Sequence, residues 1–501
     1  MILSTIRKAL SILVLCCIAA AAVAQSGRPS MPVTLAEPDS QKSKNILLVS
    51  MGHGSSLRVD MLEQPAADLD MGLATQSSRG LKPEQWQQLV QRFDVLLLDM
   101  INAEQSQKVF GPLIELFQQG QAKVISVREA QDAATHANVT QAQARDIANY
   151  YRSGGRDNYQ NLMAYIAVDL LGVSQVKVQP PVLLPDIGLY HPDYSERVTD
   201  DADAMLRWLA PRPQQPVVAV AMHRSIIELE DSQVVDQLLR EIESQGAKSF
   251  AFFFEGVEKA QDYTDLLMKD GKSVIDLMIG YRSIHYVDKR LQEFTELNVP
   301  VIHALNYLDG DHEAFLKDHA GVSGTMTPFF LVMPESSGVV DATILAAKGE
   351  PGNKVAMPEQ LSALAQRAVN HARLKHIPKS EKKLALMMWN YPPGEKNIGA
   401  AFLNVPESLQ RIASALNGAG YPVTVEDEQW YIDGAGKLLR PMYRSEDATP
   451  LVQEGLADYL PLAIYQAWFE QLPETVKQPI IERWGEAKDS AMLVDYQGEK
   501  A

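Results

Sequence analysis

The amino-acid sequence predicts an α/β fold made of successive flavodoxin/Rossmann-like domains, each a doubly wound parallel sheet. Two observations lead to this prediction. From Asn45 onward, short apolar runs alternate with longer segments that carry apolar residues at helical spacing. The apolar runs are continuous rather than alternating, which is typical of parallel strands that helices cover on both faces.

The first α/β domain is predicted over residues 44–210. Its strands are expected at residues 46–50, 95–100 and 123–127, with a helix at residues 104–119 that ends near a glycine. This order of elements favours a parallel sheet, because parallel strands need a crossover connection and helices usually supply it.

The second α/β domain is predicted over residues 211–355. It repeats the same alternation of apolar runs and amphipathic segments. The expected strands cover residues 217–222, 249–254, 274–279 and 299–304, and the expected helices cover residues 232–243 and 288–297.

A third domain is predicted to start at residue 356 and to continue to residue 501. A helix over residues 358–375 leads into an apolar run at residues 384–389, which we expect to be the opening strand. Helices are expected at residues 461–471 and 474–484. This last domain looks unfinished, and we expect it to be truncated.

The junction after this strand is the clearest candidate for a ligand site. Two prolines follow Tyr391 and stiffen the loop, while Gly394 and Gly399 allow backbone geometries that other residues disfavour. Asn404 is expected to cap the next helix, with Pro406 in its first turn. Ligands gather beyond the carboxyl ends of parallel strands, so we expect this loop to face a cleft.

Four polar residues of this loop are the first candidates for substrate binding: Asn390, Tyr391, Lys396 and Asn397. The loop contains no Gly-Lys-Ser/Thr sequence, so it does not resemble a nucleotide-binding P-loop. Packing between domains is the alternative role for this loop.

Residues that follow other predicted strands are further candidates. His53 lies between two glycines, and Arg224 could bind a carboxylate with two parallel hydrogen bonds. The alternative for Arg224 is a structural ion pair with Glu228 or Glu230.

Two histidines are considered as metal ligands. His223 follows a predicted strand, and His191 precedes a proline. A role in a turn is the default interpretation of His191, because Pro192 favours an extended backbone before it. The histidines show no paired spacing that would create a zinc site locally. The sequence alone therefore assigns no metal site.

Composition and charge exclude some classes of partner. The chain has 501 residues, 46% hydrophobic and 22% charged, and a net charge of −17. This acidic balance argues against a nucleic-acid partner. An anionic ligand would need a local basic region, which the sequence does not locate.

The amino terminus is typical of an export signal. Arg7 and Lys8 precede an apolar run at residues 9–21, and cleavage is expected after Ala24, followed by a linker at residues 25–43. An uncleaved anchor is the alternative. Both cysteines lie inside this leader, so the mature chain would have no disulfide or thiolate ligand. We expect a periplasmic or otherwise exported protein with no stable membrane span after cleavage.

Four segments, in order along the chain, resemble one protein family. They are YYRSGGRDNYQNLMAYI at residues 150–166, LPDIGLYHPD at 184–193, VMPESSG at 332–338, and the stretch from NYPPGEKNIGAA to YPV at 390–423. The family is that of the cobaltochelatase large subunit and the magnesium chelatase H subunit. The third segment makes Glu335 a further substrate-binding candidate, but it has Ser337 where the family pattern usually has an aspartate.

The resemblance implies a function. It implies the large, tetrapyrrole-binding subunit of an ATP-dependent chelatase that inserts cobalt into a corrin ring in cobalamin biosynthesis, with only the amino-terminal part represented. Cobalt or magnesium would be a substrate, and separate AAA+ subunits would use the ATP. We expect no cofactor bound by this chain, and the isolated chain to be incompetent in catalysis. The alternative, which the export signal favours, is an exported tetrapyrrole- or metal-binding protein that needs no ATP.

Overall fold

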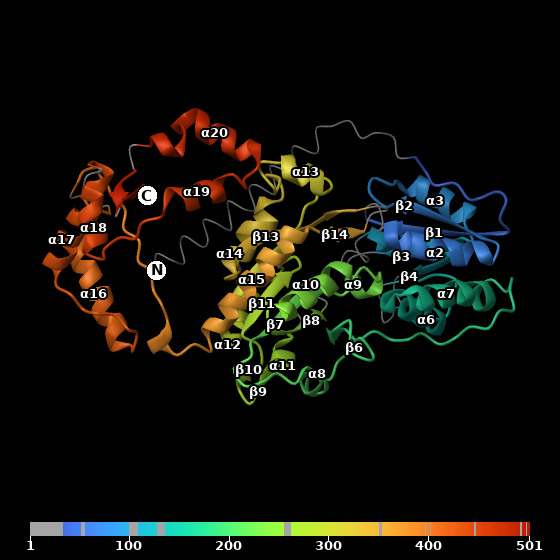
Figure 1. Cartoon of the computed structure of the whole chain (residues 1–501). Coiled ribbons are helices and arrows are strands. Elements are labelled where there is room, and N and C mark those ends of the chain that lie inside the picture. The colour runs from blue at the N-terminus through green and yellow to red at the C-terminus, as the bar shows by residue number, and fades with distance from the viewer. Residues whose placement is uncertain are drawn as a thin grey trace. The chain divides into compact units, whose positions relative to one another are not determined.

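The computed structural model describes residues 34–51, 56–99, 109–127, 136–254, 262–349, 353–395, 397–400, 402–444, 447–490, 493–496 and 498–500. The predicted leader and the first part of the linker lie outside these residues. The chain divides into two compact units, Met1–Arg373 and Leu374–Ala501, which are described separately below (Figure 1).

The first sheet of the larger unit has four parallel strands in the order β2-β1-β3-β4. They are β1 Lys44–Ser50, β2 Met71–Ser77, β3 Val95–Asp99 and β4 Lys123–Ser126. Three of these strands were predicted. The sequence analysis missed β2, because its residues Thr75 and Gln76 interrupt the apolar run. An edge strand can carry such residues, since it has a neighbour on one side only.

Helices cover both faces of this sheet. On one face, Ile46 and Leu48 pack against α2 Ser56–Asp68, α6 Gln141–Ser153 and α7 Arg156–Tyr165. On the other face, residues from β1 and β3 pack against α3 Pro83–Arg92 and α5 Ile114–Gln119. The continuous apolar strands therefore have the double burial that the sequence predicted.

The second sheet has eight strands in the order β14-β13-β12-β11-β7-β8-β5-β6. Its five parallel strands are β7 Val217–His223, β8 Lys248–Phe254, β11 Leu277–Tyr281, β12 Val301–Asn306 and β13 Val340–Lys348. Three antiparallel strands complete it, namely β5 Ile187–Tyr190, β6 Val198–Thr199 and β14 Lys354–Ala356. Together the two sheets confirm an α/β fold with parallel sheets.

Helices also cover both faces of the second sheet. One face packs against α10 Gln233–Ser244 and α15 Pro358–Leu374, and the other against α8 Ala202–Leu209 and α12 Val287–Leu297. Strands β5 and β6 and helix α15 thus share the core of the predicted second domain, although their residues lie outside 211–355. The shorter elements of this unit are α9 Ser225–Glu228, α11 Thr264–Leu267, β9 Met268–Lys269, β10 Lys272–Ser273, α13 His312–Lys317 and α14 Met333–Ser336.

The smaller unit is helical. Its elements are α16 Val405–Gly418, α17 Glu428–Leu439, α18 Ala448–Gln453, α19 Leu462–Phe469, α20 Glu474–Trp484 and the short pair β15 Asp495–Tyr496 and β16 Glu499–Lys500. The Asn404 side chain caps α16 by accepting the Glu407 backbone N–H at 3.3 Å, as predicted. Among the described residues of the whole chain, no helix is both long and apolar enough to span a bilayer.

The predicted strand at residues 384–389 is wrong. These residues form no strand, and Met387 and Trp389 are 94% and 76% exposed. A continuous apolar run becomes a buried strand only where a neighbouring strand pairs with it and helices cover it. The described part of this unit contains no strand besides β15 and β16, which pair with each other.

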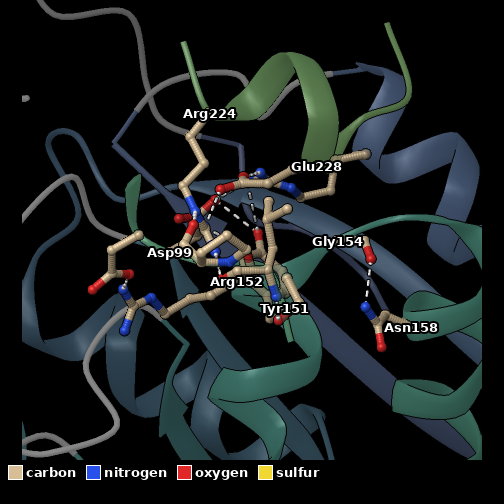
Figure 2. A network of polar contacts seen from close by, with 12 residues as sticks. Asp99, Tyr151, Arg152, Gly154, Asn158, Arg224 and Glu228 are labelled. Atoms are coloured by element: carbon tan, nitrogen blue, oxygen red, sulfur yellow. Dashed lines mark hydrogen bonds and ion pairs between the residues drawn. The ribbon is translucent and has the colours of Figure 1, made fainter. Parts of the chain in front are cut away.

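A buried ion-pair network connects the two α/β layers of the larger unit. Arg58 of α2 donates through Nη1 to Asp99 Oδ2 at 3.0 Å and through Nη2 to Glu228 Oε2 at 2.9 Å. Asp99 ends β3 of the first sheet, while Glu228 ends α9, which follows β7 of the second. The Tyr151 hydroxyl also donates to Asp99 Oδ2, at 2.7 Å. Figure 2 shows Asp99, Tyr151 and Glu228 converging on this point.

Arg58→Met is expected to lower the free energy of unfolding by about 3 kcal/mol, because it leaves two carboxylates with fewer partners in a buried site. Urea unfolding followed by far-ultraviolet circular dichroism measures the change. Lys269→Met is the control: Lys269 pairs with Asp203 at 2.6 Å, and both side chains are more than half exposed, so the loss should stay below about 1 kcal/mol. An equal loss of unfolding free energy in the two variants would contradict a stabilising role for the buried network.

Candidate functional site

The larger unit contains an open cleft of about 970 Å³. Its lining consists of residues 153–155, Asn158, residues 182–186, Tyr190, residues 196–200, Ile226, Ile227, Glu230 and Ser232. They include Gly154, Gly155 and Asn158 of the Gly-Gly-x-x-Asn pattern, and Pro185 and Tyr190 of the Pro-x-x-Gly-x-Tyr-His-Pro pattern. The patterns that are far apart in the chain therefore meet in one cleft.

The two glycines allow one wall to approach the end of α9. Gly154 has a φ of +66°, and a Cβ there would lie 2.4 Å from the backbone oxygen of Glu228. The Gly155 N–H donates to that same oxygen at 2.7 Å. A residue with a side chain at position 154 would both clash and adopt a disfavoured backbone conformation.

The asparagine of the same pattern joins two walls. Asn158 Nδ2 donates to the carbonyls of Gly154 at 2.8 Å and Val182 at 2.9 Å, and Asn158 Oδ1 accepts the Val182 N–H at 2.9 Å. Figure 2 shows the first of these bonds. The pattern thus has a structural explanation: each of its three named residues fixes the relative position of two cleft walls.

Arg224 connects the same walls through hydrogen bonds to their backbone carbonyls. It is buried, and Nη1 donates to Glu228 Oε1 and to the Arg152 carbonyl, both at 2.6 Å. Nε donates to the carbonyl of Pro185 at 3.1 Å and Nη2 to that of Leu184 at 2.9 Å. Of the two roles considered for Arg224, the structure contains the ion pair with Glu228 (Figure 2).

The cleft combines apolar residues with charged residues of both signs. Val182 and Leu183 are 73% and 65% exposed, and Pro185, Ile226 and Ile227 also line the cleft. At its rim, Arg152 pairs with Asp186 at 3.1 Å and Arg156 with Glu230 at 3.3 Å, while Arg197 lies in the lining itself.

These arginines were missed in the sequence analysis. They are separated along the chain and are outnumbered by acidic residues overall. The sequence does contain one indication of two of them, since Arg152 and Arg156 flank the two glycines of the motif.

Each of the two histidines considered as metal ligands accepts a backbone hydrogen bond at one ring nitrogen, while Nε2 of His191 is buried without a hydrogen bond, 3.4 Å from Glu243 Oε1. His191 is buried, and its Nδ1 accepts the Asp193 N–H at 3.1 Å, which is the predicted turn role. His223 Nε2 accepts the Ser283 N–H at 3.1 Å. Burial, assisted by the positive charge of Arg282, lowers the pKa of His223 to about 3, so its ring is neutral at pH 7. Among the described residues, no three His, Cys, Asp or Glu side chains are grouped to hold a metal ion.

The candidates of the Asn-Tyr-Pro-Pro loop lie in the smaller unit, apart from this cleft's lining. Asn390 Nδ2 donates to the carbonyls of Gly394 at 2.9 Å and Asn397 at 2.7 Å, and its Oδ1 accepts the Tyr443 hydroxyl at 2.8 Å. Asn397 Nδ2 donates to the Pro393 carbonyl at 3.2 Å. These amides therefore stabilise the loop itself.

The remaining candidates are dispersed. Tyr391 is 61% exposed, and Glu335 lies exposed on α14, where its carbonyl accepts the Gly338 N–H at 3.0 Å. His53 and Lys396 fall outside the described residues. The smaller unit has its own cavity of about 530 Å³ between α19 and α20, and none of the loop candidates lines it.

Comparison with known proteins identifies the family. The family described as CobN/Magnesium Chelatase matches residues 148–501, which is more than half of the chain. The chain therefore belongs to the CobN/magnesium chelatase family, and the resemblance seen in the sequence motifs is confirmed.

Individual relatives agree with this assignment. The chain is 27% identical over 298 residues to magnesium-chelatase subunit ChlH of Oryza sativa subsp. indica, covering 55% of this chain and 21% of the relative. It is 25% identical over 375 residues to aerobic cobaltochelatase subunit CobN of Pseudomonas aeruginosa, covering 72% of this chain and 29% of the relative. The chain thus spans less than a third of either protein.

A solved structure shares the fold. The catalytic subunit of cobaltochelatase from Mycobacterium tuberculosis superimposes with a TM-score of 0.57 and 18% sequence identity, covering 91% of this chain and 37% of that chain. At this identity, the likeness concerns the fold.

Gly154→Ala is expected to lower the free energy of unfolding by about 2–4 kcal/mol. The added Cβ would clash with Glu228, and the alanine would have to adopt a positive φ. Gly172→Ala is the matched control: its φ is +64°, but no atom lies within 4 Å of the added Cβ. It should lose only about 1–2 kcal/mol, the cost of the backbone conformation. Thermal unfolding measures both variants. If Gly154→Ala loses no more stability than Gly172→Ala, position 154 does not lie as close to the backbone of Glu228 as described.

His223 is expected to make stability depend on pH. The unfolded chain binds a proton on this ring near its ordinary pKa of 6.5 and the folded chain only near 3. The unfolded state therefore binds more protons between these pH values, so this contribution is complete above pH 6.5 and is lost as the pH falls toward 3.

The test compares wild type with His223→Gln, which keeps an acceptor for Ser283. Between pH 7.5 and 4.5, wild type should lose about 2 kcal/mol more stability than the variant, as measured by urea unfolding at each pH. Parallel pH profiles would show that His223 is not the neutral buried ring described here.

Proposed function

We propose that this chain is part of the large subunit of an ATP-dependent metal chelatase and that its cleft binds the tetrapyrrole ring. The observation that carries this proposal is that two motifs of the chelatase family build the walls of the cleft. The family match covers residues 148–501, and relatives of the chain are named as subunits of magnesium chelatase and cobaltochelatase. In this proposal, cobalt or magnesium is a substrate, and the ring is a corrin of cobalamin biosynthesis or a porphyrin.

The chemistry of the cleft suits such a ring. Exposed Val182 and Leu183 can pack against its apolar face, and Arg197 in the lining can bind a carboxylate at its edge. Metal insertion requires the ion to lose water and the ring to lose protons, so a ring enclosed between large α/β layers favours the reaction. The strand orders support a related inference, that both layers are doubly wound, flavodoxin/Rossmann-like domains.

Catalysis by the whole assembly would need partners. The ATP would be hydrolysed by separate AAA+ subunits, and the chain alone would bind the ring without inserting metal.

A second candidate function is an exported protein that binds a tetrapyrrole or a metal without ATP. The leader pattern of Arg7, Lys8 and residues 9–24 favours it, because an exported protein meets no ATP pool. Mass spectrometry of the exported protein, starting at Gln25, would support this location. Insertion of cobalt that requires ATP and motor subunits would favour the chelatase instead.

The ring-binding proposal is tested by titrating the chain with metal-free protoporphyrin and with a metal-free cobyrinate derivative, followed by absorbance. Leu183→Glu is expected to weaken binding at least about tenfold, because it places a charge on an apolar wall. Leu316→Glu is the matched control, since Leu316 is 67% exposed on α13 and lines no part of the cleft. Absence of binding by wild type, or equal weakening by both variants, would refute the proposal.

A further inference from the structure

One arginine of the cleft lies at a specialised turn. Arg197 closes the loop that starts at His191: the Arg197 carbonyl accepts the His191 N–H at 3.0 Å, and the Arg197 N–H donates to the Tyr194 carbonyl at 2.9 Å. Its φ is +60°, in the left-handed region that is uncommon for residues with a Cβ. The turn leads directly into β6 and places Arg197 in the lining of the cleft.

A largely buried polar cluster holds the guanidinium group. Nη2 of Arg197 donates to the hydroxyls of Tyr190 at 2.8 Å and Ser232 at 3.3 Å. These hydroxyls donate in turn to the two carboxylate oxygens of Asp236, at 2.6 Å from Tyr190 and 3.0 Å from Ser232. Tyr190 and Ser232 are 1% and 7% exposed. The arginine is therefore ordered before any ligand arrives, which lowers the entropy cost of binding.

The rest of the guanidinium group is available. Within the described residues, Nε and Nη1 of Arg197 donate to no acceptor, and no carboxylate lies within ion-pair distance. This distinguishes Arg197 from Arg152 and Arg156, which already pair with carboxylates at the rim. A positive charge with free N–H donors, fixed in position, is suited to a carboxylate.

The surroundings restrict where an anionic group can bind. Glu196, Asp200 and Glu230 also line the cleft and repel a negative charge. Asp186 is a fourth carboxylate of the lining and pairs with Arg152 at 3.1 Å, while Val182, Leu183, Ile226 and Ile227 provide an apolar part. A ligand with an apolar body and a carboxylate at its edge would therefore be bound in one orientation, with the carboxylate at Arg197.

We propose that Arg197 is the anchor for a carboxylate of the ligand in this cleft, and that the cluster of Tyr190, Ser232 and Asp236 positions it. That the ligand is a tetrapyrrole rests on the function proposed above. The anchor itself rests on the geometry of the cleft, so the two can fail separately.

The test compares two porphyrins that differ in whether their two carboxylates are free or methyl-esterified. Protoporphyrin has two free carboxylates, and its dimethyl ester has none. Arg197→Gln is expected to weaken protoporphyrin binding about 10- to 100-fold and to leave binding of the ester within about twofold, because the ester offers no charged acceptor. Arg207→Gln, at an exposed arginine of α8 outside the cleft, is the control and should change neither affinity.

Other results would overturn the anchor. Equal losses for both porphyrins would assign Arg197 a structural role, and no loss for either would remove it from the ligand site. Tyr190→Phe provides a second check, because it releases the guanidinium while keeping the charge. It should weaken protoporphyrin binding by less than Arg197→Gln does, and again spare the ester.

If wild type binds neither porphyrin, the function proposed above fails, and dodecanoate becomes the probe of the anchor. It also joins a carboxylate to an apolar body. Binding of dodecanoate that Arg197→Gln weakens and Arg207→Gln does not would support the anchor without the tetrapyrrole. Absence of dodecanoate binding, or binding insensitive to Arg197→Gln, would overturn the anchor too.

Discussion

The geometry of the larger unit depends on the pairing of Glu228 with two arginines. Its carboxylate accepts hydrogen bonds from Arg58 of the first layer and from Arg224 of the second, all three being nearly inaccessible to water. A buried charge is costly unless it is fully paired, so few arrangements of the surrounding backbone are compatible with this group. The ion pairs of Glu228 with Arg58 and Arg224 therefore determine how the surrounding backbone segments are positioned, more than they add net stability.

This constraint extends to the cleft. The backbone oxygen of Glu228 accepts the Gly155 N–H, and Arg224 donates to carbonyls of Arg152, Leu184 and Pro185. One buried ion pair thus fixes three of the segments that form the cleft walls. The apolar side chains and the guanidinium groups that could contact a ligand are carried on those segments, so the site is formed in advance of binding. Preformed sites lose less free energy to ordering on association.

Part of this could be predicted from the sequence. Continuous apolar runs identified β1, β3, β7 and β8, because double burial excludes polar residues from a central strand. The same rule failed at residues 384–389, since apolar character does not reveal whether a partner strand exists. The edge strands β2 and β6 were missed because one neighbour suffices for them and their composition is mixed, and β5 was missed because it has only four residues. The family motifs were found, but their meeting in one cleft depends on contacts between residues that are 24 or more positions apart. For the same reason, Arg197 had no local signal as a site residue.

Hydrogen–deuterium exchange of the chain, with and without saturating metal-free protoporphyrin, tests most directly whether the cleft of the larger unit binds the ring. Bound ring should slow exchange of backbone amides at residues 153–158 and 182–186, which contribute to two of the walls. Slowed exchange confined to the smaller unit, or bound ring with unchanged exchange at these walls, would contradict ring binding in this cleft.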